Sequence, residues 1–378
     1  MTAPLGNLVV LDFSRVLAGP LATMVLGDFG AEVIKVERPR GGDDTRAWGP
    51  PYGPDGQATY FQAVNRNKDT ILADLTHPAD VERLHELAAR ADVVVENFRP
   101  GVMDRLGLGY EQLAATNPGL VYCSITGFGR SEGAALPGYD LLVQAVGGLM
   151  SITGAPDGEP QKVGVALVDI ITGLFATTGI LTALRHRDAT GAGQRVELDL
   201  LTSLLAALAN QASAYTVAGV VAQRMGNAHP SIAPYDLYSA ADGDLVLAVG
   251  NDKQFAALCD VLGTPELSTD GRFTTNPERV AHRSELREEL ERRLAAFPVD
   301  TWTTRLSAAG VPAGAVNDIA GAFALAERLG LEPIVAVVGE DGQEIRLPRN
   351  PIGLSETPAQ YRTAPPALPA MADAPNPG

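Results

Sequence analysis

The chain has 378 residues, with 45 acidic and 29 basic side chains, so its formal net charge is −16. A surface of that sign repels polyanions, which excludes nucleic acid as an expected partner. Hydrophobic residues make up 46% of the sequence and charged residues 20%, a composition that indicates a folded protein rather than a disordered one. At roughly 150 residues per domain, the length allows two or three domains.

Cysteine and histidine usage indicates neither a disulfide framework nor a metal site. The two cysteines, Cys123 and Cys259, lie far apart in apolar surroundings, and the five histidines lack the spacing of metal ligands. The first residues lack the basic and apolar regions of a signal peptide. We therefore expect no metal and a location in the reducing cytoplasm.

The first 130 residues alternate short β-branched runs with helical patterns. Strands are predicted at residues 8–11, 32–36, 70–75, 92–96 and 120–125. This rhythm is typical of βαβ units that build a parallel sheet. Continuous apolar runs such as residues 93–95 suit a sheet that helices cover on both faces. The sequence therefore predicts a doubly wound α/β fold for this half.

The middle of the chain, residues 139–222, is predominantly helical in pattern. It has three long apolar stretches at 141–150, 170–184 and 200–218, and one predicted strand at 194–198. One small sheet cannot cover so much apolar surface, so we expect burial against another domain or subunit and a homo-oligomer. The run 163–184 comes nearest to a membrane span, but Asp169 within it favours a buried globular segment.

A new rhythm begins near residue 224 and predicts a smaller α+β domain. It comprises a strand pair at 235–238 and 244–249, followed by helices at 253–262, 284–297 and 299–308. Residues 311–350 return to mixed strand and helix signals. Residues 366–378 are rich in proline and alanine, which predicts a disordered tail.

Asp169 is the outstanding polar residue because it stands in an apolar run where an extended segment meets a helix predicted to begin at about Ile170. One interpretation is an N-cap that satisfies the first free N–H groups of the helix. The other uses the same geometry for chemistry. A helix N-terminus favours the ionised carboxylate, which is the form that attacks an activated carbonyl. The two interpretations are compatible.

Cationic and amide side chains follow several predicted strands. Arg15 follows the first strand, Arg38 the second, and Asn97, Arg99 and Arg105 the strand at 92–96. In open α/β sheets, ligands bind at the carboxyl ends of the strands, so these residues predict an anionic, phosphate-bearing ligand. Surface ion pairs are the alternative interpretation for each arginine.

Five ordered motifs carry a resemblance to a known family. They are Arg-Val-Leu-Ala-Gly-Pro at 15–20, Gly-Asp-Phe-Gly-Ala-Glu-Val-Ile-Lys-Val-Glu at 27–37, Asn-Arg-Asn-Lys at 65–68, Glu-Asn-Phe-Arg-Pro-Gly at 96–101 and Gly-Tyr-Asp at 138–140. Together they resemble class III coenzyme A transferases, the family of formyl-CoA transferase and carnitine CoA-transferase, which also contains α-methylacyl-CoA racemases. The segments 224–232 and 251–255 resemble the branch that moves CoA between dicarboxylates, such as succinyl-CoA and glutarate.

The resemblance implies a large Rossmann-like domain with a parallel sheet, a smaller α+β domain and an interlocked homodimer. The large domain is expected to consist of residues 1–200 and a return segment at 311–365. Residues 201–224 would link it to the small domain at 225–310. Where formyl-CoA transferase has a glycine-rich lid loop, residues 249–252 carry one glycine, and the tail lacks the final helix that is usual in relatives.

The resemblance also implies the chemistry. Asp169 matches the aspartate that attacks a donor thioester and becomes an anhydride and then an aspartyl-CoA thioester, with acyl-CoA and a small carboxylic acid as substrates and no tightly bound cofactor. The residues that match CoA ligands form three groups. The adenine end would be lined by Arg15, Val16 and Ala18, and the phosphates would be bound by Arg38 and Arg105. The pantetheine channel would be lined by Asn97, Phe98 and Tyr139, and Leu72 would add a further contact.

Two other functions remain open at this point. An α-methylacyl-CoA racemase would present a catalytic histidine where this chain has Tyr139, whose unperturbed pKa of about 10 suits it poorly to neutral acid–base work. A non-catalytic acyl-CoA-binding protein would keep the fold without turnover. The retention of Asp169 in its Gly-Val-Ala context favours the transferase over the binding protein.

Overall fold

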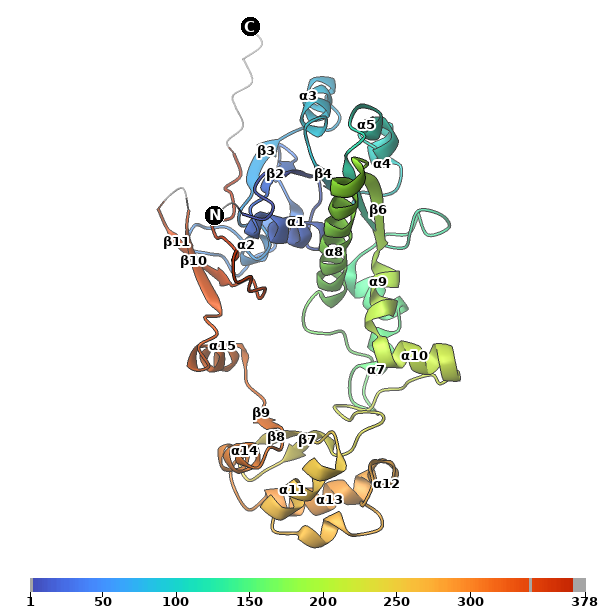
Figure 1. The fold of residues 1–378 in the computed structure, drawn as a ribbon, viewed down its shortest axis with the longest axis vertical. Coiled ribbons are helices and arrows are strands. Elements are labelled where there is room, and N and C mark those ends of the chain that lie inside the picture. Colours follow the sequence, from blue (N-terminus) through green and yellow to red (C-terminus); the bar gives the residue numbers. More distant parts are fainter. Residues whose placement is uncertain (1–2, 340–341, 370–378) are drawn as a thin grey trace. The chain divides into compact units, whose positions relative to one another are not determined.

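The computed structural model describes residues 3–339 and 342–369 (Figure 1). The chain divides into two compact units. One consists of the segments up to Leu149, from Lys162 to Val220 and from Glu332 onward; the other consists of Met150–Gln161 and Val221–Leu331. The predicted tail at 366–378 is described as far as residue 369, without regular structure, and residues 370–378 lie outside the described residues.

A six-stranded parallel sheet forms the centre of the first unit. Its strands are β1 (Val9–Asp12), β2 (Glu32–Glu37), β3 (Asp69–Leu72), β4 (Val93–Glu96), β5 (Val121–Thr126) and β6 (Gln194–Asp199). Their order is β3-β2-β1-β4-β5-β6, and every neighbouring pair is parallel. The α/β prediction is therefore confirmed. The order reverses between β1 and β4, which opens a ligand site beyond their carboxyl ends.

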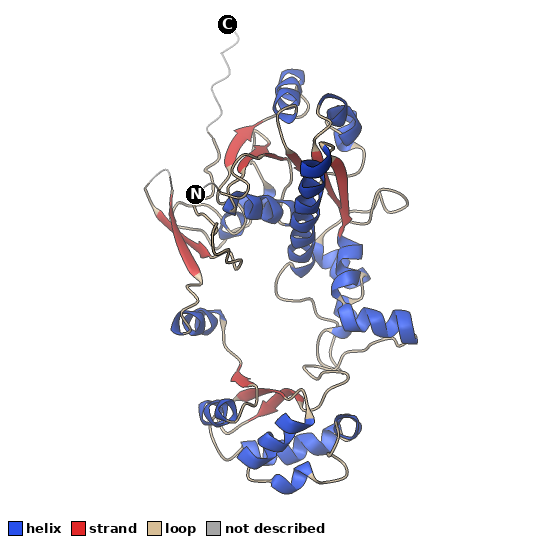
Figure 2. Cartoon of the chain, viewed as in Figure 1, coloured by secondary structure: helices blue, strands red, loops and turns tan. Residues whose placement is uncertain are grey.

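Helices cover both faces of this sheet, as the continuous apolar strands require (Figure 2). Val93 and Val95 of β4 point to the face covered by α1 (Ala18–Asp28) and α8 (Leu167–Thr190). Val94 points to the opposite face. The helices on that face are α3 (Pro78–Ala88), α4 (Val102–Arg105) and α5 (Tyr110–Thr116).

Helix α8 is the longest element and the one helix among the described residues that is long and apolar enough to span a membrane. It packs instead along α1, β5 and β6, with Ala176 and Ile180 completely buried in the core of the sheet. A Cβ at Gly173 would lie 2.7 Å from the backbone oxygen of Ala18. The close packing of α1 on α8 therefore requires glycine there, and α8 is a core helix of this unit.

The remaining helices of the first unit lie around the sheet. They are α2 (Thr59–Gln62), α6 (Asp140–Val146), α9 (Leu200–Ala207) and α10 (Ala209–Ala218), with α7 (Leu149–Ile152) at the boundary between units and a short 3₁₀ helix at Asp44–Ala47. The apolar stretches expected at 141–150 and 200–218 thus form two helices each rather than one.

The C-terminal segment joins the first unit through buried polar contacts. It contains an antiparallel pair, β10 (Ile334–Val338) and β11 (Glu344–Pro348). The carboxylate of Asp28, at the end of α1, accepts hydrogen bonds from Arg66, Asn67 and Asn350. Arg362 donates to three backbone carbonyls around the end of α1. Segments more than 300 positions apart are thereby fixed to one another.

The second unit is a small α+β structure with its own core. Its antiparallel sheet has the order β7-β8-β9, and the expected strand pair is confirmed. Its elements are β7 (Tyr235–Ser239), β8 (Asp244–Ala248), α11 (Asp252–Val261), a 3₁₀ helix (Pro265–Ser268), α12 (Asn276–Ala281), α13 (Arg283–Leu294), α14 (Val299–Ala308), β9 (Ala313–Ala315) and α15 (Ile319–Arg328). Phe255, Leu290 and Trp302 anchor the core.

Candidate active site

Asp169 lies in the first turn of α8, which begins at Leu167, three residues earlier than expected. The N-cap residue is Ala166, which offers no side-chain cap. The interpretation of Asp169 as the N-cap is therefore wrong. The cap comes from another helix, since Oδ1 of Asp140 accepts hydrogen bonds from the backbone N–H of Val168 (2.8 Å) and of Asp169 itself (3.3 Å). The side chain of Asp169 is free of the capping role.

The surroundings of Asp169 disfavour its charged form. Burial, followed by the negative charge of Asp140, raises the pKa of Asp169 to about 7. Burial and the same two carboxylates raise the pKa of Tyr60. The first turn of α8 and the start of α1 belong to one apolar cluster, which includes Val16, Leu17, Leu21, Tyr60, Ala166 and Ile170. A poorly solvated carboxylate with a raised pKa is a stronger nucleophile than an exposed one.

Three of the predicted CoA ligands meet where the strand order reverses. The side chain of Asn97, just after β4, accepts from the backbone N–H of Arg15 (2.9 Å) and donates to its carbonyl (2.8 Å). The guanidinium carbon of Arg15 lies 4.8 Å from the centroid of the Phe98 ring. The loops after β1 and β4 are thus joined, and Arg15 is held at the expected ligand-binding edge.

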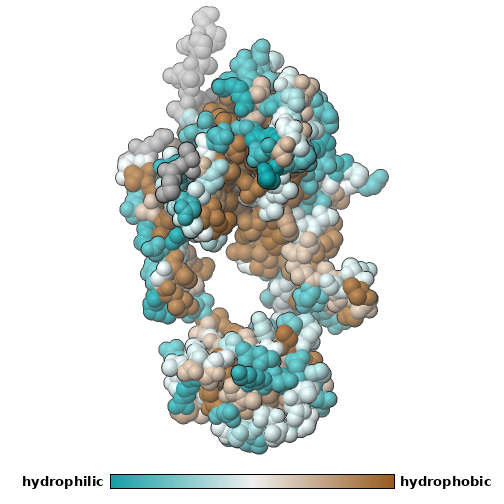
Figure 3. All heavy atoms as spheres, viewed as in Figure 1, coloured by the Kyte–Doolittle hydropathy of each residue, from teal (hydrophilic) through white to brown (hydrophobic). Residues whose placement is uncertain are grey.

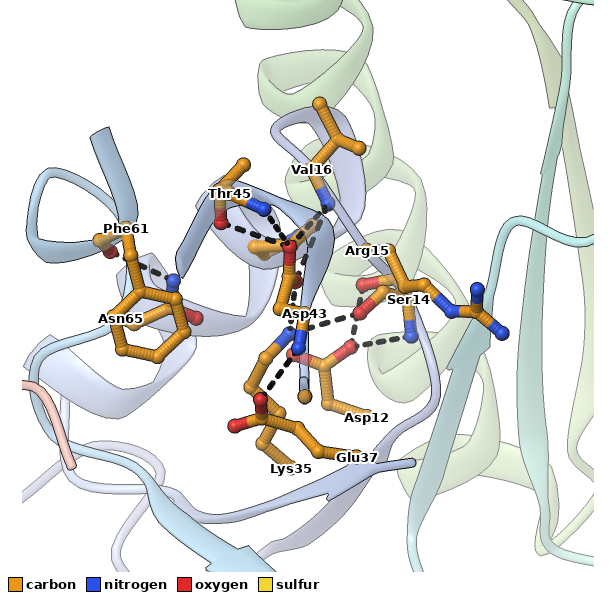
Figure 4. Close-up of polar contacts among 12 residues, drawn as sticks. Asp12, Ser14, Arg15, Val16, Lys35, Glu37, Asp43, Thr45, Phe61 and Asn65 are labelled. Carbon is orange, nitrogen blue, oxygen red and sulfur yellow. Dashed lines mark hydrogen bonds and ion pairs between the residues drawn. The ribbon is translucent and has the colours of Figure 1, made fainter. Parts of the chain in front are cut away.

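Val16 has a φ of 68°, a left-handed conformation that a β-branched residue adopts only under constraint. Its backbone N–H faces both carboxylate oxygens of Asp43, at 3.4 and 3.3 Å. Asp43 is buried against Lys35, whose Nζ lies 2.9 Å from Oδ2 and also donates to the carbonyl of Ser14 (Figure 4). A buried ion pair therefore holds the backbone of the loop that carries Arg15.

This ion pair belongs to a larger buried network that the sequence did not reveal. Asp12 accepts from Ser14, Thr23 and Lys68, and burial of Asp12 is outweighed by Lys68 and Lys35, which keep its pKa below the usual value. The pKa of Asp43 is likewise lowered, because Lys35 and the hydrogen bonds from Thr45 outweigh the effect of burial. These carboxylates are matched by cations, unlike Asp169.

Arg15 and Arg38 share a single carboxylate. Arg38, which is exposed, pairs with Asp44 and donates to the carbonyl of Gly42 (2.8 Å). Arg15 Nη1 lies 3.9 Å from Asp44 Oδ2, and burial together with the charge of Arg38 lowers the pKa of Arg15. Two guanidinium groups beside one carboxylate form a local positive site of the kind that binds phosphate.

The other predicted ligands differ in exposure. Arg105, on α4, is exposed and lines a surface depression of 520 Å³ with Leu75, Thr76 and His85. Leu72, half-buried, ends β3. Tyr139, 64% exposed, directly precedes the capping Asp140. Two further residues complete the set: Ala18 is buried as the first residue of α1, and Arg99 is exposed.

A cavity of 960 Å³ lies elsewhere in the first unit, beside the C-terminal segment, and is lined neither by Asp169 nor by a predicted CoA ligand. Its arginines are already engaged, since Arg46 pairs with Glu37 and Arg362 binds backbone carbonyls. Among residues 3–339 and 342–369, there is no group of three or more His, Cys, Asp or Glu side chains that could hold a metal ion.

Comparison with known proteins identifies the family of the chain. The family model described as "CoA-transferase family III" matches residues 5–370 of this chain. Succinate–glutarate CoA-transferase of Agrobacterium fabrum is 45% identical over 97% of this chain and 93% of its own length. Acetyl-CoA:oxalate CoA-transferase of Acetobacter aceti is 42% identical over 93% of this chain and 89% of its own length.

A solved structure extends the similarity to the whole fold. The crystal structure of a CAIB/BAIF family protein from Brucella suis superposes with a TM-score of 0.86, at 44% identity and with 97% of each chain covered. The resemblance identified in the sequence motifs is thereby confirmed. The chain belongs to CoA-transferase family III and is an enzyme that transfers CoA between carboxylates.

Proposed function

We propose that this enzyme moves CoA from a dicarboxylic thioester, such as succinyl-CoA, to an acceptor carboxylic acid, with Asp169 as the nucleophile. The observation that carries the proposal is the placement of Asp169, half-buried in the first turn of α8 and capped there by a second carboxylate rather than by its own side chain. Its neighbours Ala166 and Ile170 belong to one apolar cluster with Val16, next to the loop that presents Arg15.

The first half of the reaction loads CoA onto the enzyme. A carboxylate oxygen of Asp169 attacks the thioester carbonyl of the donor, the carbon–sulfur bond breaks, and an acyl-aspartyl anhydride and CoA thiolate form. The thiolate attacks the aspartyl carbonyl of the anhydride. The donor acid leaves as its carboxylate, and Asp169 carries CoA as a thioester.

The second half reverses these steps with the acceptor. The acceptor carboxylate attacks the aspartyl thioester, which releases the thiolate and forms a second anhydride. The thiolate then attacks the acyl carbon of the acceptor and releases the Asp169 carboxylate with the new acyl-CoA. No proton is consumed overall. The apolar side chains around Asp169 support this series of steps, because both enzyme-bound acyl species would hydrolyse if water entered.

CoA would lie along the carboxyl edge of the sheet. In this proposal Arg15, Val16 and Ala18 line the adenine end, and Arg38 and Arg105 bind the phosphates. Asn97, Phe98 and Tyr139 line the path of the pantetheine arm toward Asp169, with Leu72 at its side. The contacts among Arg15, Asn97 and Phe98 support one continuous site for these groups.

Relatives support a dicarboxylic donor and acceptor. Besides the Agrobacterium protein, the mouse and human proteins named succinyl-CoA:glutarate CoA-transferase are 45% and 44% identical to this chain. A Haloarcula hispanica protein named succinyl-CoA:mesaconate CoA-transferase is 41% identical. Since the named acceptors differ, we propose the class of dicarboxylic acids rather than one member.

We also propose that two chains form an interlocked homodimer, in the cytoplasm. Its support is apolar surface on the first unit: Leu141 and Val146 of α6 and Leu174 and Phe175 of α8 are each more than two-fifths exposed. Hydrophobic side chains gather over α8 (Figure 3).

Subunit exchange between tagged and untagged dimers tests the interlocked arrangement. We expect no exchange when the two folded dimers are mixed, and mixed dimers after the two are unfolded and refolded together. Rapid exchange on mixing would contradict this arrangement.

The nucleophile is tested by intact-protein and peptide mass spectrometry after incubation with succinyl-CoA and quenching with hydroxylamine or borohydride. We expect a mass change that maps to Asp169 and is absent from Asp169→Ala. A wild-type protein that transfers CoA with Asp169 unmodified would overturn the proposal. Exchange of the α-proton of acyl-CoA in deuterium oxide, without CoA transfer, would favour a racemase, and neither activity would favour a binding protein.

A further inference from the structure

The backbone of Asp169 is held by a side chain from another helix. Asp140, the first residue of α6, lies 29 positions earlier in the chain and is half-buried. Its Oδ1 accepts from the N–H of Val168 and of Asp169, two of the donors that the start of α8 leaves unpaired. The contact to Asp169 reaches the very residue that performs the proposed attack.

The second oxygen of Asp140 is fixed by a buried amide. Gln144, one turn further along α6 and completely buried, donates from Nε2 to Asp140 Oδ2 at 2.6 Å. Its Oε1 accepts from the backbone N–H of Val163 at 2.9 Å. Asp140 therefore cannot rotate without breaking a buried hydrogen bond. The pair Asp140–Gln144 connects α6 to both the approach to α8 and its first turn.

This cap differs from the carboxylate caps of α9 and α15 because its negative charge lies beside the proposed nucleophile. A neutral cap would satisfy the same N–H groups equally well. The described titratable groups that act on Asp169 are Asp140 from α6 and Tyr60 from α2, whereas α1 packs against the same turn with Leu17 and Leu21. The charge of Asp140 thus opposes that of Asp169 with no cation between them.

We propose that Asp140 is a positioning residue for CoA transfer, which fixes the backbone of Asp169 through the α8 cap and keeps the Asp169 carboxylate basic through its own negative charge. The inference rests on the proposed role of Asp169 as nucleophile. The two effects are separable. The hydrogen bonds set the geometry, while the charge sets the pH at which the nucleophile becomes active.

A double substitution separates them. In Asp140→Asn, the new Nδ2 faces Gln144 Nε2, so two N–H donors face each other without an acceptor. If the Gln144 amide rotates, its Nε2 faces the backbone N–H of Val163 instead, which is again a donor. In Asp140→Asn combined with Gln144→Glu, the Glu carboxylate accepts from both, and the Asn Oδ1 still caps α8. The hydrogen bonds to Val163 and to the start of α8 are restored, whereas the long bond from Gln144 Nε2 to the carbonyl of Val165 (3.5 Å) is lost and the negative charge moves away from Asp169.

The experiment compares kcat, KM for succinyl-CoA and the pH profile of kcat for wild type, Asp140→Ala, Asp140→Asn and the double variant. We expect Asp140→Ala and Asp140→Asn to lower kcat about 10- to 100-fold with little change in KM, since small misplacement of a reacting group has that cost. We expect the double variant to recover most of kcat, with the acidic limb of its profile at lower pH than in wild type.

Matched controls keep the outcome decisive. Asp318→Ala removes a comparable cap, the Asp318 carboxylate on the N–H of Gly321 at the start of α15, and should leave kcat and the profile unchanged. An unchanged kcat in Asp140→Ala, or a double variant whose profile coincides with that of wild type, would overturn the inference. Asp169→Asn tests the proposed function separately, because full turnover there would refute the nucleophile whatever Asp140 does.

Discussion

Two groups of carboxylates in the same unit have opposite electrostatic surroundings. Asp12, at the end of β1, and Asp43, in the loop after β2, are matched by Lys68 and Lys35, and their pKa values are lowered despite burial. At the start of α8, Asp169 faces another carboxylate, and its pKa is raised to about 7. The first group is compensated and holds a loop in shape. The second is uncompensated, and that lack of compensation is what makes a carboxylate reactive.

Removing the reactive carboxylate should affect activity far more than stability. We expect Asp169→Asn to lower the rate of CoA transfer at least about 1,000-fold, because loss of a covalent nucleophile removes the pathway itself. The free energy of unfolding should stay equal or rise, since an unfavourable buried charge is lost. Chromatographic assay of both CoA thioesters and urea denaturation check the two parts. A marked loss of stability would mean that Asp169 belongs with the structural carboxylates.

Breaking an ion pair of the compensated group should lower the free energy of unfolding strongly. We expect Lys35→Met to destabilise the fold by about 3–5 kcal/mol, because Asp43 would remain buried without its cation. Glu111→Gln, which breaks the exposed pair with Arg195, should cost less than about 1 kcal/mol. Urea denaturation of both variants beside wild type measures the difference. Equal effects of the two substitutions would show that burial does not distinguish the pairs.

The two groups also differ in what the sequence could predict about them. β-branched runs predicted the parallel sheet, and strand-end positions placed Arg15 and Asn97 at its carboxyl edge, because parallel strands align their carboxyl ends along one edge. Phe98 was named only through the resemblance to the family. The start of α8 was misplaced by three residues, because its cap comes from Asp140, a tertiary contact that leaves no local signal. Lys35 likewise lies in an apolar strand, and no local sequence pattern predicts its ion pair with Asp43.

The pH dependence of the reaction should expose the uncompensated carboxylate. Only ionised Asp169 can attack the thioester, and with a pKa of about 7 its ionised fraction falls about tenfold between pH 8 and pH 6. The rate of the first acylation step should therefore rise with pH and level off above 8. The raised pKa also means that the folded state holds this proton more tightly than the unfolded chain, so Asp169 lowers stability above pH 4 rather than adding to it. Single-turnover acylation by succinyl-CoA in rapid-quench experiments reports the step directly. A flat profile from pH 5 to 8 would place Asp169 among ordinary carboxylates.

The smallest effect concerns Asp44, which is half-buried and is shared by two cations, Arg15 and Arg38. If those arginines bind CoA phosphates, Asp44 competes with the ligand for them. We expect Asp44→Asn to tighten CoA binding about two- to fivefold, the range that an exposed ion pair allows, and to steepen the loss of affinity with added salt. Isothermal titration with CoA and with dephospho-CoA measures both trends and tells which phosphate is involved. Weaker binding by Asp44→Asn would mean that this carboxylate orients the arginines for the ligand instead of competing with it, and would place Asp44 with Asp43 among the carboxylates that shape the site.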